Sequence, residues 1–209
     1  PQVRWIDGQG FLFLFTKYTN GREVYSCTNP DGIEWTPDVK FAGMGGHYQT
    51  SHQIGKRVIT AFNMHPGGNL DKRSNIYFLQ TDDMGATWRT VEGKAVTLPL
   101  TDVENPALAI DYLTGKTNVY IHDLDLDAQG RPVILYVTSK SHVPGPKGDP
   151  RWWVVARWRG DHWDARQVTP ANHNYTTGSL YLEPDGQWRI IGPTEKGPQP
   201  YGSGAEVGI

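Results

Sequence analysis

Apolar residues recur along the chain in short strands separated by glycine-containing turns, and no long helix-forming segment interrupts them. One pattern occurs four times: a short strand, a turn centred on glycine and a second apolar strand. The four predicted hairpins cover residues 3–6 and 11–15, 48–52 and 58–62, 120–126 and 133–137, and 180–183 and 188–191. This repetition predicts an all-β chain built from similar units.

A third strand follows three of the hairpins, near residues 23–26, 75–79 and 152–158, and each leads into a Gly-x-x-Trp turn. The second turn, residues 81–88, has the full Asp-box pattern Thr-x-Asp-x-Gly-x-Thr-Trp. Asp and Thr side chains can hydrogen-bond the backbone of such a turn, glycine accepts a left-handed conformation, and the tryptophan packs against neighbouring strands. In the first and third turns, Pro30 and Trp158 stand at the position of the motif aspartate.

A fourth, outer strand can follow each of these tryptophans, so every repeat predicts a four-stranded antiparallel blade. Repeated blades of this kind are typical of a β-propeller. The predicted blades cover approximately residues 1–45, 46–100, 116–170 and 174–209 of one partial propeller domain. The fourth repeat ends in its third strand, at 205–209, before any Asp box. Because a propeller closes into a ring, about three and a half blades predict a fragment of a larger propeller. The alternative is a complete four-bladed protein.

Composition narrows the classes of partner. The 209 residues carry a formal net charge of -2, which gives no reason to expect nucleic acid or an anionic membrane. The single cysteine, Cys27, permits no intramolecular disulfide. No apolar run approaches the ~18 residues of a membrane span, and no signal peptide is visible after Pro1. We therefore expect neither membrane insertion nor a nucleic-acid partner.

The predicted blade topology separates two sets of loops. The turns within the hairpins and the Asp boxes are short and lie on one face. The opposite face receives longer segments, at residues 40–47, 64–74, 93–120, 139–151, 169–178 and 193–204. Function tends to be carried by elaborated loops on a rigid scaffold, so this face is the candidate site. Its polar and aromatic candidates are His47, His65, Lys72, Arg73, His122, His142, Arg151, His173, Tyr175, Glu195, Lys196 and Tyr201.

Several of these residues have structural explanations. His122 alternates with acidic residues and can serve as a hydrogen-bonding residue at a strand end. His142 lies in a Pro/Gly-rich loop and can simply be solvated, and Arg73 belongs to a short charged run. His47 and His65 are stronger candidates, because both lie near glycines that allow a ligand to approach closely.

Four motifs carry a resemblance to a known family. They are the Asp box, the Ala-Phe-Asn-Met-His-Pro-Gly-Gly segment at 61–68 leading to Asp-Lys-Arg-Ser-Asn at 71–75, and the segments at 126–133 and 173–181. Together they resemble the BNR repeat-containing family, a branch of the sialidase-like superfamily that includes ulvan-lyase-type polysaccharide lyases on seven-bladed propellers. The resemblance implies a fragment of a seven-bladed propeller, a polysaccharide or oligosaccharide substrate, and a secreted or periplasmic location.

In the lyase members, paired histidines in neighbouring blades act with tyrosine and arginine on a uronate, and His47 and His65 resemble that pair. The resemblance implies β-elimination, which needs a base, an acid and positive charge to stabilise an enolate-like intermediate. Tyr175 is the candidate acid or base, and Arg73 or Arg151 is the candidate carboxylate clamp. His173 and Glu195 complete the predicted substrate-binding set.

Two other functions stay open at this stage. A sialidase-like glycoside hydrolase would need paired carboxylates, and Glu104 and Glu195 show no pairing in the sequence. The Arg-Ile-Ile-Gly-Pro segment from Arg189 echoes a sialidase element only faintly. A non-catalytic glycan-binding propeller is the third class. No metal-ligand spacing is visible, so no metal ligands and no certain cofactor are predicted, and structural calcium or zinc is left open.

Overall fold

A computed structural model of the chain describes residues 2–19, 21–143, 145–194 and 207–208, and for His47 it describes the backbone alone. The chain divides into two compact units. The first unit contains Pro1–Asn69 and Ile76–Ile110, and the second contains Leu70–Asn75 and Asp111–Ile209.

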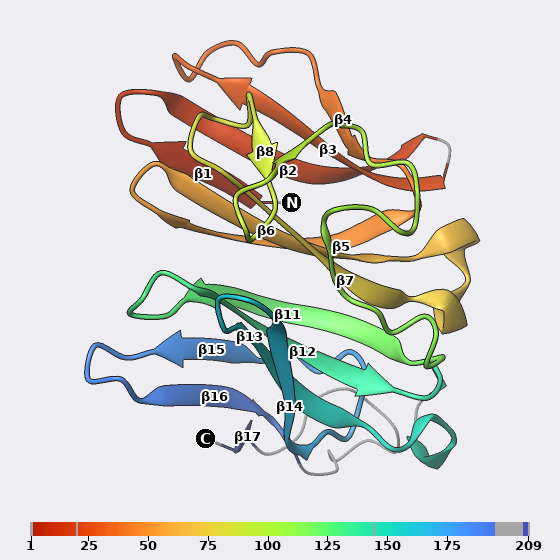
Figure 1. The fold of residues 1–209 in the computed structure, drawn as a ribbon. Coiled ribbons are helices and arrows are strands. Elements are labelled where there is room, and N and C mark those ends of the chain that lie inside the picture. The colour runs from red at the N-terminus through yellow and green to blue at the C-terminus, as the bar shows by residue number, and fades with distance from the viewer. Residues whose placement is uncertain (1, 20, 144, 195–206, 209) are drawn as a thin grey trace. The chain divides into compact units, whose positions relative to one another are not determined.

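The first unit is built on two antiparallel sheets (Figure 1). The first sheet has the order β1-β2-β3-β4, with strands Gln2–Ile6, Gly10–Thr19, Gly21–Asn29 and Val39–Ala42. The second has the order β5-β6-β7-β8-β9, with strands Gly46–Ile54, Arg57–Met64, Ser74–Thr81, Trp88–Arg89 and Ala95–Val96. Strand β10 (Leu108–Ile110) also pairs with β7. The short 3-10 helix η1 (Pro66–Gly68) follows β6 in this unit, whereas the next one, η2 (Leu70–Lys72), belongs to the second unit.

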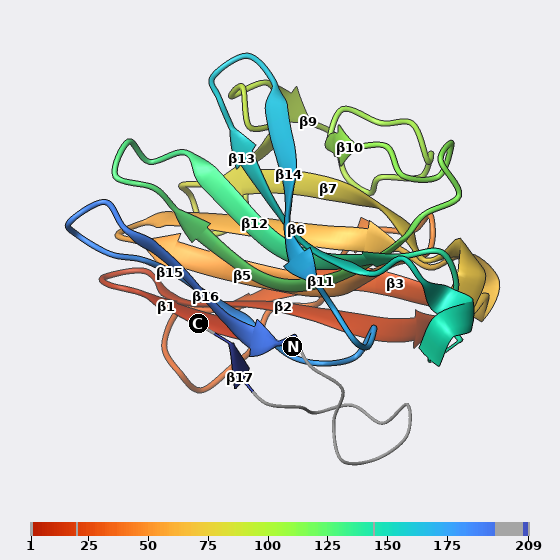
Figure 2. The same cartoon turned by 90° about the horizontal axis from the view of Figure 1, so that it is seen from below.

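The second unit also contains two antiparallel sheets, seen from another direction in Figure 2. Its first sheet has the order β11-β12-β13-β14, with strands Asn118–Leu126, Pro132–Ser139, Trp152–Trp158 and Trp163–Pro170. Its second has the order β15-β16-β17, with strands Ser179–Leu182, Trp188–Pro193 and Val207–Gly208. The 3-10 helix η3 (Gly145–Gly148) lies between β12 and β13. The prediction of an all-β propeller made of antiparallel blades is confirmed.

The Asp box between β7 and β8 is held by its own side chains. One Asp83 carboxylate oxygen accepts hydrogen bonds from the Thr81 hydroxyl (2.8 Å) and the Thr87 backbone N–H (2.9 Å), and the other accepts from the Thr87 hydroxyl (2.6 Å). Gly85 has a φ of 80°, and a Cβ there would lie 3.3 Å from the Trp88 indole nitrogen. The turn therefore needs glycine for both its conformation and its close contact with tryptophan.

The corresponding turn of the first sheet uses different residues. Pro30 occupies the motif position, but the Asn29 side chain accepts hydrogen bonds from the backbone N–H groups of Asp31 and Gly32. Asp31 in turn accepts from the N–H of Ile33 at 2.8 Å. The sequence comparison with the Asp-box pattern missed this substitution, in which two neighbouring residues replace the motif aspartate.

Trp88 belongs to the apolar core of the first unit and is 2% exposed. Its ring packs edge-on against Phe41 of β4, with centroids 4.7 Å apart. Phe41 also contacts Phe62 of β6 at 5.6 Å, so the aromatic contacts cross from the first sheet to the second. The Asp box thus anchors the packing of two adjacent sheets.

Trp153 has the equivalent place in the second unit, where it is completely buried. Its indole N–H donates to the carbonyl of Pro193 at 3.0 Å, which links β13 to β16. A Cβ at Gly178 or Gly192 would lie 2.5 Å or 2.8 Å from the indole ring, so the backbone contacts the ring closely at both glycines. Asp123 of β11 also accepts a hydrogen bond from the Leu180 backbone at 2.8 Å.

We predict that Asp83→Asn lowers the free energy of unfolding by roughly 1 to 2 kcal/mol, because the variant weakens charge-assisted hydrogen bonds that hold the turn. Chemical denaturation measures this loss. Asp82→Asn is the matched control, since the Asp82 side chain is 54% exposed and its ion pair with Arg89, at 3.4 Å, lies at the surface. Equal stability of the Asp83 and Asp82 variants would contradict the role of the box.

The same site predicts a dependence on pH. Burial raises the pKa of Asp83, but the stronger combined effect of hydrogen bonds from Thr87 and Thr81 lowers it below its usual value. The stabilisation is therefore present above the pKa of an unfolded aspartate and is lost as pH falls through the lower folded pKa. Acid titration of stability should be shallower in Asp83→Asn than in the parent protein.

Candidate active site

Arg73 is the centre of a cluster in the second unit. It lies between η2 and β7 and is 1% exposed, and its backbone carbonyl accepts a hydrogen bond from Val119 at 2.9 Å. The guanidinium carbon lies 4.8 Å from the ring centroid of Tyr120 and 5.5 Å from that of Tyr175. The two tyrosine rings meet edge-on, with centroids 5.2 Å apart. The electron-rich ring faces thus stabilise a guanidinium that is almost removed from water.

Tyr120 keeps its phenolic proton at neutral pH. Burial raises its pKa to about 12, and the opposing charge of Arg73 does not overcome this effect. Its hydroxyl accepts a hydrogen bond from the Asn174 side chain at 3.2 Å, and the Asn118 side chain is a second hydrogen-bond partner.

Asn174 connects this tyrosine to Arg151. The Arg151 Nε donates to the Asn174 side-chain oxygen at 2.6 Å, and its Nη1 donates to Asp149 at 2.6 Å. A third bond goes to the carbonyl of Val143, and only 3% of Arg151 is exposed. Arg151 therefore spends at least three of its donors on protein acceptors and orders the loop that carries Asn174.

His173 positions Tyr175. Its Nδ1 accepts a hydrogen bond from the Tyr175 backbone N–H at 3.0 Å, and the two rings are 5.7 Å apart. His173 is 9% exposed, whereas Tyr175 is 43% exposed. The histidine thus fixes the backbone of a tyrosine whose side chain reaches solvent.

His65 lies in the first unit, directly after β6, and is completely buried. Its backbone N–H donates to Gly45 at 2.7 Å, and its ring stacks on Tyr48 with centroids 6.3 Å apart. The ring Nδ1 contacts a guanidinium nitrogen of Arg22 from β3. Because arginine can only donate, Nδ1 must accept, and the ring proton lies on Nε2. His65 is therefore placed as a neutral donor through Nε2–H.

Of the predicted site residues, Arg73, Arg151, His173 and Tyr175 come together in the second unit, and His65 lies in the first. His47 is on β5, but its side chain lies outside the described part of the structure, as does the whole of Glu195. Sequence analysis missed Arg22, Tyr120 and Asn174. Tyr120 and Arg22 lie on strands β11 and β3, whereas the predicted site residues come from loops and strand ends.

Two further histidines have structural partners. The ring Nδ1 and the backbone N–H of His142 both contact one carboxylate oxygen of Asp71, at 2.9 Å and 2.8 Å. These contacts connect the β12–β13 loop to η2. His122 packs against Trp153 with ring centroids 4.9 Å apart. Burial lowers the His122 pKa to about 4, so this ring is neutral at neutral pH.

Within the described ranges, no group of three or more His, Cys, Asp or Glu side chains is arranged to hold a metal ion. None of the helices among these residues is long and apolar enough to span a membrane.

The chain belongs to the BNR repeat-containing family, whose pattern matches residues 11–171. A search of curated protein sequences finds no match. The fold is that of propeller-type polysaccharide lyases among the solved structures, and three of them are informative.

The first similar structure is described as a polysaccharide lyase of a new family, PL25 ulvan lyase, bound to -[GlcA(1-4)Rha3S]-. It shares 20% identity with a TM-score of 0.72, over 91% of this chain and 48% of that one. A second structure, also described as a PL25 ulvan lyase, shares 20% identity with a TM-score of 0.70, over 86% of this chain and 46% of that one. The polysaccharide lyase Uly1 shares 14% identity with a TM-score of 0.66, over 100% of this chain and 48% of that one. The chain thus spans about half the length of these structures.

We predict that nitrogen NMR of isotope-labelled histidine shows the His65 proton on Nε2 and none on Nδ1. Arg22→Met removes the donor and should yield a mixture of tautomers. Arg89→Met is the control, because Arg89 is a partly exposed residue of β8. A protonated Nδ1 in the parent protein would contradict the assigned contact.

We also predict that His122 resists protonation. Its pKa is lowered to about 4 by burial, so the stability gained by keeping it neutral is present above an unfolded value of about 6.5 and is lost as pH falls through about 4. Thermal unfolding of His122→Gln should lose less stability over this acid range than the parent. An exposed-site control, His162→Gln, should follow the parent.

Proposed function

We propose that this chain carries active-site residues of a polysaccharide lyase that cleaves a uronate-containing polysaccharide by β-elimination. The observation that carries the proposal is the buried Arg73 guanidinium against the rings of Tyr120 and Tyr175. A tyrosine can transfer a proton, and an arginine can stabilise the negative charge that develops beside it. The fold shared with polysaccharide lyases, one bound to a GlcA-containing saccharide, supports the same class.

The reaction sets the roles to be filled. A base removes the proton from C5 of the uronate, the C–H electrons form the C4=C5 double bond, and the bond from C4 to the glycosidic oxygen breaks. The leaving oxygen takes a proton from an acid. Negative charge accumulates on the carboxylate in between, so donors or cations near it lower the barrier.

Tyr175 is the proposed acid. It is the exposed member of the cluster, and its backbone is fixed by His173. When the phenol gives its proton to the leaving oxygen, the phenolate that results faces the positive charge of Arg73, which stabilises it. This electrostatic role is assigned to Arg73 because its guanidinium carbon lies 5.5 Å from the Tyr175 ring centroid, whereas Arg151 orders the loop through Asn174.

The proposed role of His65 is to donate a hydrogen bond to the uronate carboxylate. Its Nδ1 contact with Arg22 supports a proton on Nε2, and a nitrogen that already carries a proton cannot act as a base. Proton abstraction then falls to His47 or to Tyr175 itself. Tyr120, with its pKa raised to about 12 by burial, is a second hydrogen-bond donor within the second unit.

Tyr175→Phe in the full-length protein should reduce kcat on ulvan by about 100- to 10,000-fold, the range for loss of a general acid or base. Product is followed by the ultraviolet absorbance of the unsaturated uronate. Tyr181→Phe is the matched control, since Tyr181 is 48% exposed against 43% for Tyr175. Undiminished turnover in Tyr175→Phe would remove this residue from the mechanism.

Arg73→Lys keeps the charge but loses the planar group that stacks on two rings. We expect a fall in kcat with the polysaccharide still bound, compared with Arg89→Lys, since the Arg89 side chain on β8 is 43% exposed. A reducing sugar released without unsaturated product would instead indicate a hydrolase. Binding without either product would indicate a glycan-binding propeller.

A further inference from the structure

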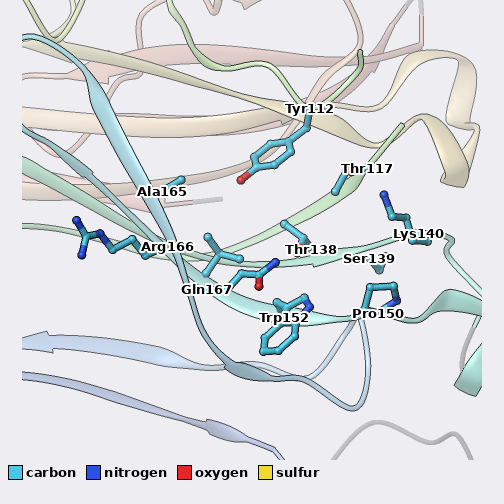
Figure 3. A pocket seen from close by; sticks show the side chains of 11 residues that line it. Tyr112, Thr117, Thr138, Ser139, Lys140, Pro150, Trp152, Ala165, Arg166 and Gln167 are labelled. Atoms are coloured by element: carbon cyan, nitrogen blue, oxygen red, sulfur yellow. The ribbon is translucent and has the colours of Figure 1, made fainter. Parts of the chain in front are cut away.

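A cavity of about 550 Å³ lies on the first sheet of the second unit, among residues that the catalytic proposal does not use. Figure 3 shows its lining, which comes from the ends of β12 and β13, from β14 and from the segment that precedes β11. Its size is within the range of about 300 to 1,000 Å³ typical of small-molecule sites.

Trp152 is an aromatic surface in this cavity. Side chains alternate along a strand, so Trp152 and Val154 line the cavity while Trp153 points into the core on the opposite face. Thr138 is the direct partner of Trp152 across the β12–β13 pair, and it places a hydroxyl beside the indole. An indole next to hydroxyl groups suits a sugar ring, which has an apolar face of C–H bonds and a polar edge.

Tyr112 forms a fixed wall. Its hydroxyl lies 2.7 Å from that of Tyr136 on β12, and its backbone N–H donates to the Asn75 side chain at 2.8 Å. Tyr136 and Asn75 therefore fix Tyr112 in place before a ligand binds, which reduces the entropy cost of ordering this wall on binding.

The charges of the lining are positive. Lys140 and Arg166 appear at opposite ends of the lining in Figure 3, and none of the described lining residues is acidic. The Arg166 Nε donates a hydrogen bond to the carboxylate of Asp164 at 3.1 Å, and Asp164 itself does not line the cavity. No ion pair within the described ranges involves the ammonium group of Lys140, so its charge is available to a ligand.

We propose that this cavity is a second saccharide-binding site, separate from the catalytic cluster, which holds an anionic sugar unit with its ring on Trp152 and its carboxylate or sulfate at Lys140. Gln167 and Thr117 supply polar groups at the edges of the sugar. Such a site retains a long chain on the enzyme between cleavage events. The preference for a uronate polymer rests on the proposed lyase function.

The test measures binding separately from turnover. Retardation of the full-length protein in gels containing ulvan gives the affinity for polymer, with neutral dextran as the reference. Trp152→Ala should weaken ulvan binding by about three- to tenfold, the scale of one aromatic contact. Lys140→Glu should weaken it further at low salt and leave dextran migration unchanged. Trp5→Ala and Lys147→Ala, at exposed positions outside the lining, are the matched controls.

Turnover of a short ulvan oligosaccharide provides the second readout. We expect Trp152→Ala and Lys140→Glu to turn it over like the parent protein, while their KM for the polymer rises. Unchanged polymer binding in both variants would overturn the second site, and so would equal loss of short-substrate turnover. Because Lys140 is exposed, its variant keeps the test valid if Trp152→Ala does not fold. If the parent has no lyase activity but the variants still lose ulvan binding, the second site stands and the lyase function fails.

Discussion

A buried tryptophan between two adjacent sheets is the constraint on which each unit depends. Trp88 enters the core of the first unit from the Asp box and packs on Phe41 at 4.7 Å. Trp153 lies on β13, an inner strand of its sheet, and the backbone of Gly178 and Gly192 packs against its indole ring. The two solutions differ: one uses a turn held by Asp83, and the other uses glycines that let a neighbouring strand approach the indole. In both units a single tryptophan buries a large apolar area, and its close packing determines how the two adjacent sheets fit together.

The rigid blades allow costly groups to be buried around them. Arg73, Arg151 and His65 are almost fully removed from water, and burying such groups is unfavourable unless partners compensate. Arg73 has two aromatic faces, and Arg151 has acceptors from a side-chain amide, a carboxylate and a carbonyl. The arrangement of Arg73 and Arg151 with the partly exposed Tyr175, all in the second unit, supports a site that moves protons beside negative charge.

Sequence analysis could predict the blades because their signals are local. Strand alternation, turn glycines and the Asp-box residues act within a few positions of one another, and the structure confirms the all-β fold. The loop positions of Arg73, His173 and Tyr175 followed from the same order of strands and turns within each predicted blade. Arg22 and Tyr120 could not be found this way, because each lies inside a strand and meets its partner through long-range packing. The substitution of Asn29 and Asp31 for the motif aspartate was missed because a fixed pattern does not show which side chain reaches a turn amide.

The measurement that tests the central claim most directly is the fate of solvent oxygen during cleavage. Full-length protein is incubated with ulvan in water enriched in a heavy oxygen isotope, and the products are analysed by mass spectrometry. β-Elimination breaks the bond from C4 to oxygen without adding water, so the account predicts unsaturated products that carry no solvent oxygen at the cleaved bond. Products one water heavier, with the isotope incorporated, would show hydrolysis and contradict the proposed lyase.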